Sequence, residues 1–139
     1  MSVCAIKICG VTRESDVELV SKSGADYMGL LVDMPSPRSL DPDRAARLAE
    51  ISGVSVILLF FDKPAADVFE ITKTIRPAGI QLQGRESRKT VAFLRDKLGC
   101  EIWKGVHLPA SGTGAVDVED TLQRIGIYRD AGADKILLD

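Results

Sequence analysis

The sequence is poor in cysteine, histidine and aromatic residues, and it carries no excess of positive charge. Its three cysteines, Cys4, Cys9 and Cys100, are an odd number without a CxxC pair, which disfavours both a disulfide framework and a zinc site. Acidic residues outnumber basic ones, 20 against 18, so neither nucleic acid nor an anionic membrane is an expected partner. Because three cysteines cannot all form pairs, at least one thiol should be free.

Long hydrophobic runs are also missing. No apolar segment reaches the length of a membrane span, and the first residues lack the pattern of a secretory signal. We therefore expect a cytoplasmic protein. A chain of 139 residues with 45% hydrophobic content can bury a substantial core, so residues 1–139 are predicted to form a single domain.

Short apolar segments alternate with helical patterns along the whole chain. The six predicted strands cover residues 3–8, 27–32, 54–61, 78–82, 101–106 and 135–138, and five amphipathic patterns lie between them. Because no hairpin signal joins successive strands, the order predicts an α/β fold with a parallel sheet of right-handed βαβ units. A spacing of about one strand per 25 residues favours a (β/α)₈ barrel over a doubly wound sheet.

Several residues are predicted to begin helices. Thr12 is a candidate N-cap, with Glu14 in the following turn, and Asp41 precedes a proline at the first helical position. Asp117 is the corresponding cap of the last helix. The proline-rich segment 34–40 is predicted to be a loop.

The predicted strands are too few to close a barrel. A (β/α)₈ barrel has eight strands, and with six the first and last would keep unpaired apolar edges. We therefore expect residues 1–139 to be the N-terminal part of a longer (β/α)₈ protein, covering about six strands and five helices.

Functional groups of parallel α/β folds gather where strands end. Six polar or reactive residues stand at these positions: Cys9, Asp33, Asp62, Gln83, His107 and Asp139. The two internal aspartates are interpreted as loop or capping residues, and a lone histidine is most often structural. A thiol and a terminal carboxyl at one mouth could act as a base and an acid.

The first strand places a cation beside the thiol. Because side chains alternate along a strand, Lys7 and Cys9 share one face, and the ammonium could favour the thiolate. Two other interpretations stay open at this point: Cys9 as a small buried hydrophobe, and Lys7 as a structural, ion-paired lysine.

Five short motifs occur in a characteristic order. They are Lys7-Ile8-Cys9-Gly10 with Thr12-Arg13, Ser23-Gly24-Ala25-Asp26 with Gly29, Ser36-Pro37-Arg38, Gln81-Leu82-Gln83-Gly84 with Glu86, and Ile136-Leu137-Leu138-Asp139. In order and spacing the sequence resembles the phosphoribosylanthranilate isomerase family.

The resemblance implies a (β/α)₈ isomerase of tryptophan biosynthesis that uses no cofactor or metal. Its reaction is the Amadori rearrangement of the phosphorylated substrate N-(5-phosphoribosyl)anthranilate to 1-(2-carboxyphenylamino)-1-deoxyribulose 5-phosphate. It further implies that Cys9 is the general base, that Asp139 is the general acid and that Arg38 binds the anthranilate carboxylate. Lys7 and Gln83 are further candidate substrate-binding residues, and both a monomer and a homodimer remain open. Arg38 could alternatively be a surface residue that stabilises its loop.

The sequence departs from the family pattern at two places. Gln83 stands where the family usually has histidine, and Asp33-Met34-Pro35 lacks the family's aromatic residue and lysine. A related isomerase with a different phosphorylated substrate, or a non-catalytic partial barrel completed by self-association, are therefore alternatives.

The phosphate-binding loops of the family lie outside the predicted strands. The family holds its phosphate with loops after the seventh and eighth strands, beyond the six predicted here, so we expect residues 1–139 alone to be inactive. The glycine-containing segment 111–114 is interpreted as a flexible loop rather than a phosphate site.

Overall fold

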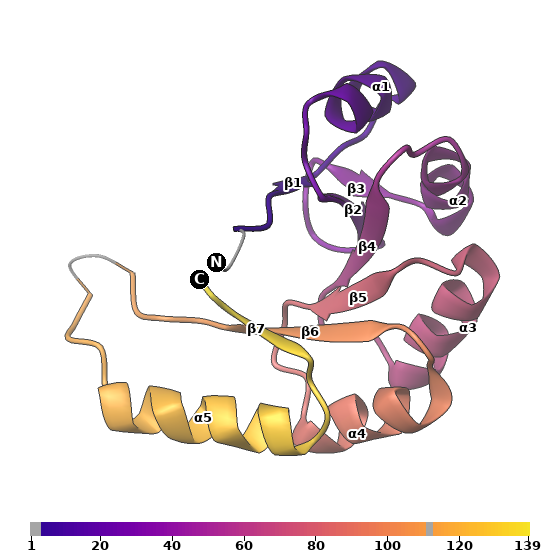
Figure 1. The fold of residues 1–139 in the computed structure, drawn as a ribbon. Coiled ribbons are helices and arrows are strands. Elements are labelled where there is room, and N and C mark those ends of the chain that lie inside the picture. The colour runs from indigo at the N-terminus through magenta and orange to yellow at the C-terminus, as the bar shows by residue number, and fades with distance from the viewer. Residues whose placement is uncertain (1–3, 111–112) are drawn as a thin grey trace.

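Parallel strands form one curved sheet with the helices on a single side of it (Figure 1). The computed structural model describes residues 4–110 and 113–139. The strands are β1 (Lys7–Cys9), β2 (Tyr27–Val32), β3 (Ser39–Leu40), β4 (Ser55–Phe60), β5 (Gly79–Leu82), β6 (Glu101–Val106) and β7 (Lys135–Leu138). The helices are α1 (Glu14–Lys22), α2 (Pro42–Glu50), α3 (Ala65–Ile75), α4 (Arg88–Lys97) and α5 (Val118–Asp130).

The strand order distinguishes between the two α/β architectures. The strands run β1-β2-β4-β5-β6-β7 across the sheet, and all their pairs are parallel. A doubly wound sheet reverses its order at a switch point and carries helices on both faces, whereas this order is strictly sequential. The predicted parallel α/β fold is therefore confirmed. Within the described residues β1 pairs only with β2, and β7 only with β6, so the closed eight-stranded barrel stays a prediction.

The two faces of the sheet have different surroundings. Side chains on the helix-facing side form the main core, which includes Met28, Leu30, Leu58, Phe60, Ile80 and Leu82. Each of these fully buried side chains stabilises the fold by about 1.5–3 kcal/mol relative to an exposed position. The inner face carries a smaller apolar cluster of Leu31, Ile57, Leu59 and Trp103. Strand alternation thus assigns one face to the helices and the other to the interior of the curve.

Two of the three predicted helix caps are confirmed. The side chains of Asp41 and Asp117 accept hydrogen bonds from the third residue beyond them, at 2.8 and 2.9 Å. The predicted cap at Thr12 is wrong, because α1 begins at Glu14 and its N-cap is Arg13, which makes no side-chain capping bond. Thr12 lies one residue too early for its hydroxyl to reach the free amides of the first turn.

The predicted loop 34–40 contains a short strand. Ser39–Leu40 pairs with β2 in parallel, and Leu40 is buried in the main core. A two-residue strand has no periodicity of its own, so only its partner strand defines it. Segment 111–114 includes two residues, 111 and 112, that lie outside the described part of the chain, and its interpretation as a flexible loop is not tested.

The aspartates that follow β2 and β4 are turn residues. Asp33 and Asp62 adopt left-handed backbone conformations, with φ of 45° and 48°. The carboxylate of Asp33 lies 3.3 Å from Lys63 Nζ, and that of Asp62 accepts a 2.5 Å hydrogen bond from the amide of Arg85. None of the helices in the described ranges is long and apolar enough to span a membrane.

Candidate active site

A cavity of about 390 Å³ lies at the carboxyl ends of the strands on the inner face of the sheet. Its walls come from β1, β2, β4, β5, β7 and the loop after β2, segments that are far apart in the sequence. The lining residues are Lys7, Cys9, Leu31, Met34, Arg38, Leu59, Gln81, Gln83, Leu137, Leu138 and Asp139. All five residues selected from the sequence as candidate catalytic or binding groups therefore meet in one cavity.

The thiol of Cys9 is accommodated by a missing side chain on the neighbouring strand. Gly29 pairs with Cys9 across β1 and β2, and a Cβ at Gly29 would lie only 2.8 Å from the Cys9 Sγ. Cβ atoms in proteins essentially never lie this close to another atom, so the absence of a side chain at Gly29 leaves the space that the sulfur occupies. Cys9 is exposed toward the cavity, which argues against its interpretation as a buried hydrophobe.

Lys7 shares the face of Cys9, as strand alternation predicts. Burial lowers the pKa of the Lys7 ammonium, and the charge of Cys9 offsets part of this shift. Its Nζ lies 5.1 Å from the centre of the Trp103 ring, a distance typical of a cation–π contact. No carboxylate pairs with Lys7 among the described residues, so it is not the ion-paired lysine considered above.

A chain of hydrogen bonds connects Lys7 to Asp139. The ammonium donates to Oε1 of Gln81, whose Nε2 donates to Oε1 of Gln83 at 2.6 Å, and Gln83 Nε2 donates to Oδ2 of Asp139 at 2.8 Å. An ammonium has only donors, so it fixes the direction of both amides behind it. Gln83 consequently offers N–H groups to the Asp139 carboxylate, a function that histidine could share but that requires no titratable group.

Arg38 extends across the first turn of the chain into the cavity. Its Nη1 donates to the carbonyl oxygen of Cys9 at 3.2 Å. Gly10 has a φ of +84°, and a Cβ there would overlap the Arg38 guanidinium, so glycine permits both the turn and the passage of the guanidinium. A guanidinium has five N–H donors, and this is its one side-chain bond within residues 4–110 and 113–139. The others can bind an anion.

His107 lies beside Asp139 at the rim of the site. Its Nε2 is 2.6 Å from the carbonyl oxygen of Gln83, and its Nδ1 is 3.9 Å from Oδ2 of Asp139. The ring therefore holds the backbone that carries Gln83 and is not among the residues that line the cavity. A structural interpretation of this lone histidine agrees with the geometry.

Gln81 is the main residue of the site that sequence reasoning missed. It is buried, and it is the only link between Lys7 and Gln83 in the hydrogen-bond chain of the described residues. The signal was available, because Gln81 and Gln83 are two residues apart on one strand and must share a face. A polar residue on the inner face of an otherwise apolar strand indicates a buried partner.

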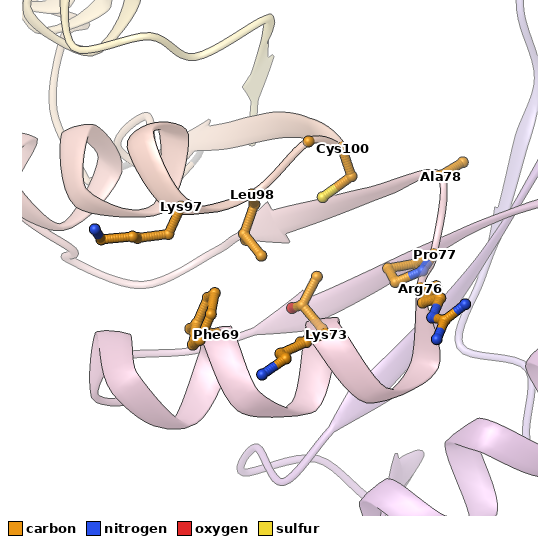
Figure 2. Close-up of a pocket in the computed structure, with 10 residues that line it drawn as sticks. Phe69, Lys73, Arg76, Pro77, Ala78, Lys97, Leu98 and Cys100 are labelled. Carbon is orange, nitrogen blue, oxygen red and sulfur yellow. The ribbon is translucent and has the colours of Figure 1, made fainter.

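A larger cavity, of about 650 Å³, lies at the opposite end of the sheet between α3 and the connection from α4 to β6 (Figure 2). Ala78 and Cys100, which line it, precede β5 and β6, and none of the candidate catalytic residues is near. Lys73 and Lys97 at its rim belong to the last turns of α3 and α4, where cations commonly compensate the helix dipole. Their charge is thus explained without a ligand, and the smaller cavity is the better candidate active site.

No cluster of metal-ligating side chains accompanies the site. In the part of the chain that the structure describes, no three His, Cys, Asp or Glu residues are arranged to hold a metal ion. The chemistry available to the cavity comes from a thiol, a carboxylate, two cations and two amides.

Comparison with known proteins gives a single family. Residues 6–133 match the sequence model of the family described as N-(5'phosphoribosyl)anthranilate (PRA) isomerase. Among curated relatives, N-(5'-phosphoribosyl)anthranilate isomerase from Paramagnetospirillum magneticum is 32% identical over 136 residues, which cover 96% of this chain and 59% of the relative. The corresponding protein from Rhodospirillum centenum is 35% identical, with the same coverage of both chains.

Solved structures agree with this result. Phosphoribosyl anthranilate isomerase from Thermococcus kodakaraensis superposes with a TM-score of 0.82 at 27% identity, over 99% of this chain and 65% of that one. The present chain spans about three fifths of the length of the curated relatives it matches.

Proposed function

Since the chain belongs to the phosphoribosylanthranilate isomerase family, we propose that it takes part in that family's reaction, with Cys9 as the general base and Asp139 as the general acid. The substrate is N-(5-phosphoribosyl)anthranilate, and the product is 1-(2-carboxyphenylamino)-1-deoxyribulose 5-phosphate. One observation carries the proposal: Cys9, Arg38 and Asp139, from three distant segments, line the same cavity.

The reaction opens the ribose ring and moves a hydrogen. Protonation of the ring oxygen by Asp139 lets the nitrogen lone pair break the bond between C1 and that oxygen, which leaves an iminium ion. The positive charge acidifies the C2 proton, and the Cys9 thiolate removes it to give an enaminol. Protonation at C1 and loss of the hydroxyl proton at C2 then yield the ketone. Two groups that exchange protons with the substrate from separate strands suit this sequence.

The surrounding residues have distinct parts in this proposal. Lys7 lies on the same strand face as Cys9 and places a cation beside the thiol at the cavity. Arg38 binds the carboxylate of the anthranilate ring with its unused donors. Asp139, as the general acid, donates its proton to the ring oxygen of the substrate. Gln83 orients the Asp139 carboxyl through the 2.8 Å hydrogen bond.

We also propose that residues 1–139 form one domain, the N-terminal part of a cytoplasmic (β/α)₈ barrel, and that these residues alone are inactive. The open edges of β1 and β7 support the first part, because a closed barrel pairs every strand. To test function we design a chimera in which residues 1–139 are followed by the C-terminal two fifths of the P. magneticum relative. This protein is called the completed chimera below.

The test of function is a direct assay of the completed chimera. Purified protein is incubated with N-(5-phosphoribosyl)anthranilate labelled with deuterium at C2, and product and solvent deuterium are measured. We expect formation of the aminoketose with loss of the C2 label, because the base removes that atom. Because C2 of the product is a carbonyl carbon, a label kept in the product can stand only at C1; its complete transfer to C1 would contradict a base that exchanges with solvent, and failure to convert would contradict the function. The same fusion with Cys9→Ala controls for activity contributed by the relative's segment.

A second candidate function is a related isomerase with a different aryl group on its phosphorylated substrate. Met34 lines the cavity where the family usually has an aromatic residue and a lysine, so the ring subsite differs. Failure of the completed chimera to support growth of a tryptophan auxotroph, together with turnover of another aminoaldose, would favour this alternative.

A further inference from the structure

Lys104 is a buried cation in the middle of the molecule. Its side chain is 1% exposed, on the helix-facing side of β6, where the neighbouring alternate residue Ile102 belongs to the main core. An ammonium without partners at such a position would cost many times the stability it could contribute. The groups that surround it therefore explain why the sequence keeps a charge there.

The ammonium is enclosed by main-chain carbonyl oxygens. Its Nζ donates to the carbonyls of Gly84 and Gly105, each at 2.8 Å, and to that of Leu82 at 3.2 Å. A lysine ammonium has three N–H donors, so these bonds use all of them. The Tyr128 ring of α5 covers it at 4.9 Å.

Glu86 supplies the counter-charge as an ion pair rather than as an acceptor of a hydrogen bond from the ammonium. Its Oε2 lies 3.1 Å from Lys104 Nζ but has no hydrogen-bond partner in residues 4–110 and 113–139. The other oxygen, Oε1, accepts hydrogen bonds from the amides of Asp62 and Gly84 at 3.0 and 3.1 Å. The ion pair thereby connects the ends of β4, β5 and β6.

The carbonyls that Lys104 holds flank one candidate site residue. Leu82 and Gly84 are the neighbours of Gln83, whose own carbonyl contacts His107 on the other side. Gly105, the residue after Lys104, leaves space for the side chain of Gln83, because a Cβ at Gly105 would lie 2.7 Å from Oε1 of Gln83. Two successive residues of β6 thus fix the backbone of Gln83 and leave space for its side chain.

From this geometry we propose that Lys104 is a positioning residue for Gln83, and through Gln83 for the carboxyl of Asp139. The proposal rests on the proposed function only for its catalytic consequence, since the positioning itself can be measured without turnover. The contacts of Lys104 Nζ are with the carbonyls of Leu82, Gly84 and Gly105, with Glu86 and with Tyr128, so it acts by holding the carbonyls of the residues on either side of Gln83. Glu86 provides the buried counter-charge for the ammonium.

An ion pair of this kind could also be purely structural, and a partly exposed cation of the same chain, Arg95, serves as the comparison. Arg95 donates to the carbonyls of Gly132 and Cys100 and pairs with the carboxylate of Asp134. This cation binds carbonyls and a carboxylate as Lys104 does, but at the amino ends of β6 and β7. Loss of either cation should destabilise the fold, whereas only loss of Lys104 should change Gln83.

The test compares Lys104→Met with Arg95→Met in the 139-residue protein by nuclear magnetic resonance. The Gln83 signature consists of two measurements. The first is the difference in chemical shift between the two Nε2 protons of Gln83, which arises because one of them is bonded to Asp139. The second is the rate of hydrogen exchange at the backbone amides of Gln83 and Gly84. In Lys104→Met we expect the difference in chemical shift to fall by at least half and the exchange of both amides to accelerate about tenfold beyond any global destabilisation, because the held peptide loses charge-assisted bonds. In Arg95→Met the signature should be unchanged.

Two results would overturn the proposal. One is a folded Lys104→Met protein with the wild-type Gln83 signature, and the other is an equal change in Arg95→Met, which would indicate general loosening. Should Lys104→Met fail to fold, Lys104→Gln decides, because its amide has two donors for three carbonyls and must weaken the signature. An unchanged signature in that variant would also refute the positioning role. A changed signature in Lys104→Met without any loss of activity in the same variant of the completed chimera would instead contradict only the proposed function.

Discussion

Replacement of Gly29 by alanine should remove activity by displacing the Cys9 thiol. The added Cβ would lie 2.8 Å from Sγ of Cys9 and 3.1 Å from a methyl group of Leu59, whereas ordinary contacts begin at 3.4 Å. The sulfur must therefore move by at least 0.6 Å or turn to another rotamer. Overpacking of this kind costs about 1–3 kcal/mol of folding stability.

The expected kinetic effect follows from the geometry of proton transfer. A misplacement on the order of 1 Å at a reacting group costs up to about 100-fold in rate. For Gly29→Ala in the completed chimera we predict a kcat lowered about 10- to 100-fold, which is about 1.4–2.7 kcal/mol in the barrier. The KM should change little, because Arg38 and the ring subsite are untouched.

Two measurements separate displacement of the thiol from general damage. Steady-state kinetics give kcat, and alkylation by iodoacetamide followed by mass spectrometry gives the reactivity of Cys9 relative to exposed Cys4 in the same molecule. Gly126→Ala is the control, because a Cβ there meets no atom within 4 Å, and it should stabilise α5 by about 0.5–1 kcal/mol without a kinetic effect. A wild-type kcat in Gly29→Ala would refute the role given to the sulfur's position.

Three further changes probe charge, recognition and packing. Hydrogen bonds from Lys135 and Trp103 lower the pKa of Glu101 below its ordinary value, so its stabilisation is present above that ordinary value and is lost as the pH falls through the lowered one. In Glu101→Gln the free energy of unfolding, measured with urea, should therefore fall less steeply as the pH is lowered. The wild-type dependence on pH in this variant would contradict the prediction. Arg38→Lys should raise KM about 10-fold with kcat nearly unchanged, because a point charge replaces a planar fork, and an unaltered KM would argue for the loop-stabilising role. Leu58→Ala should lower the unfolding free energy by about 2–5 kcal/mol, since Leu58 is 0% exposed; a loss under 1 kcal/mol would be contrary to its core position.

The long buried elements could be predicted from sequence because their patterns are self-contained. The strands Tyr27–Val32 and Glu101–Val106 have the predicted bounds, since nearly continuous apolar runs have few alternatives in a parallel sheet. The caps at Asp41 and Asp117 are local as well. By contrast, β3 is defined only by its pairing with β2, a contact that no local pattern encodes.

The same distinction applies to the site. Strand alternation places Lys7 and Cys9 on one face, and the strand-end rule brings Asp139 to the same cavity. The partners of these groups could not be predicted, because Gln81 and Lys104 act through contacts between strands. A lysine inside the apolar strand β6 indicates some buried partner, but nothing in its spacing identifies the three carbonyls and Glu86.

The central claim is that Cys9 and Asp139 exchange protons with the substrate. The most direct measurement is the kcat of Cys9→Ala and Asp139→Asn in the completed chimera with saturating N-(5-phosphoribosyl)anthranilate, while circular dichroism verifies folding. General acid–base groups contribute about 10²–10⁴-fold each, so each variant should lose at least 100-fold in kcat. The Cys9→Ala variant should also retain deuterium at C2 of the substrate. A folded variant of either kind with near-normal turnover would contradict the account.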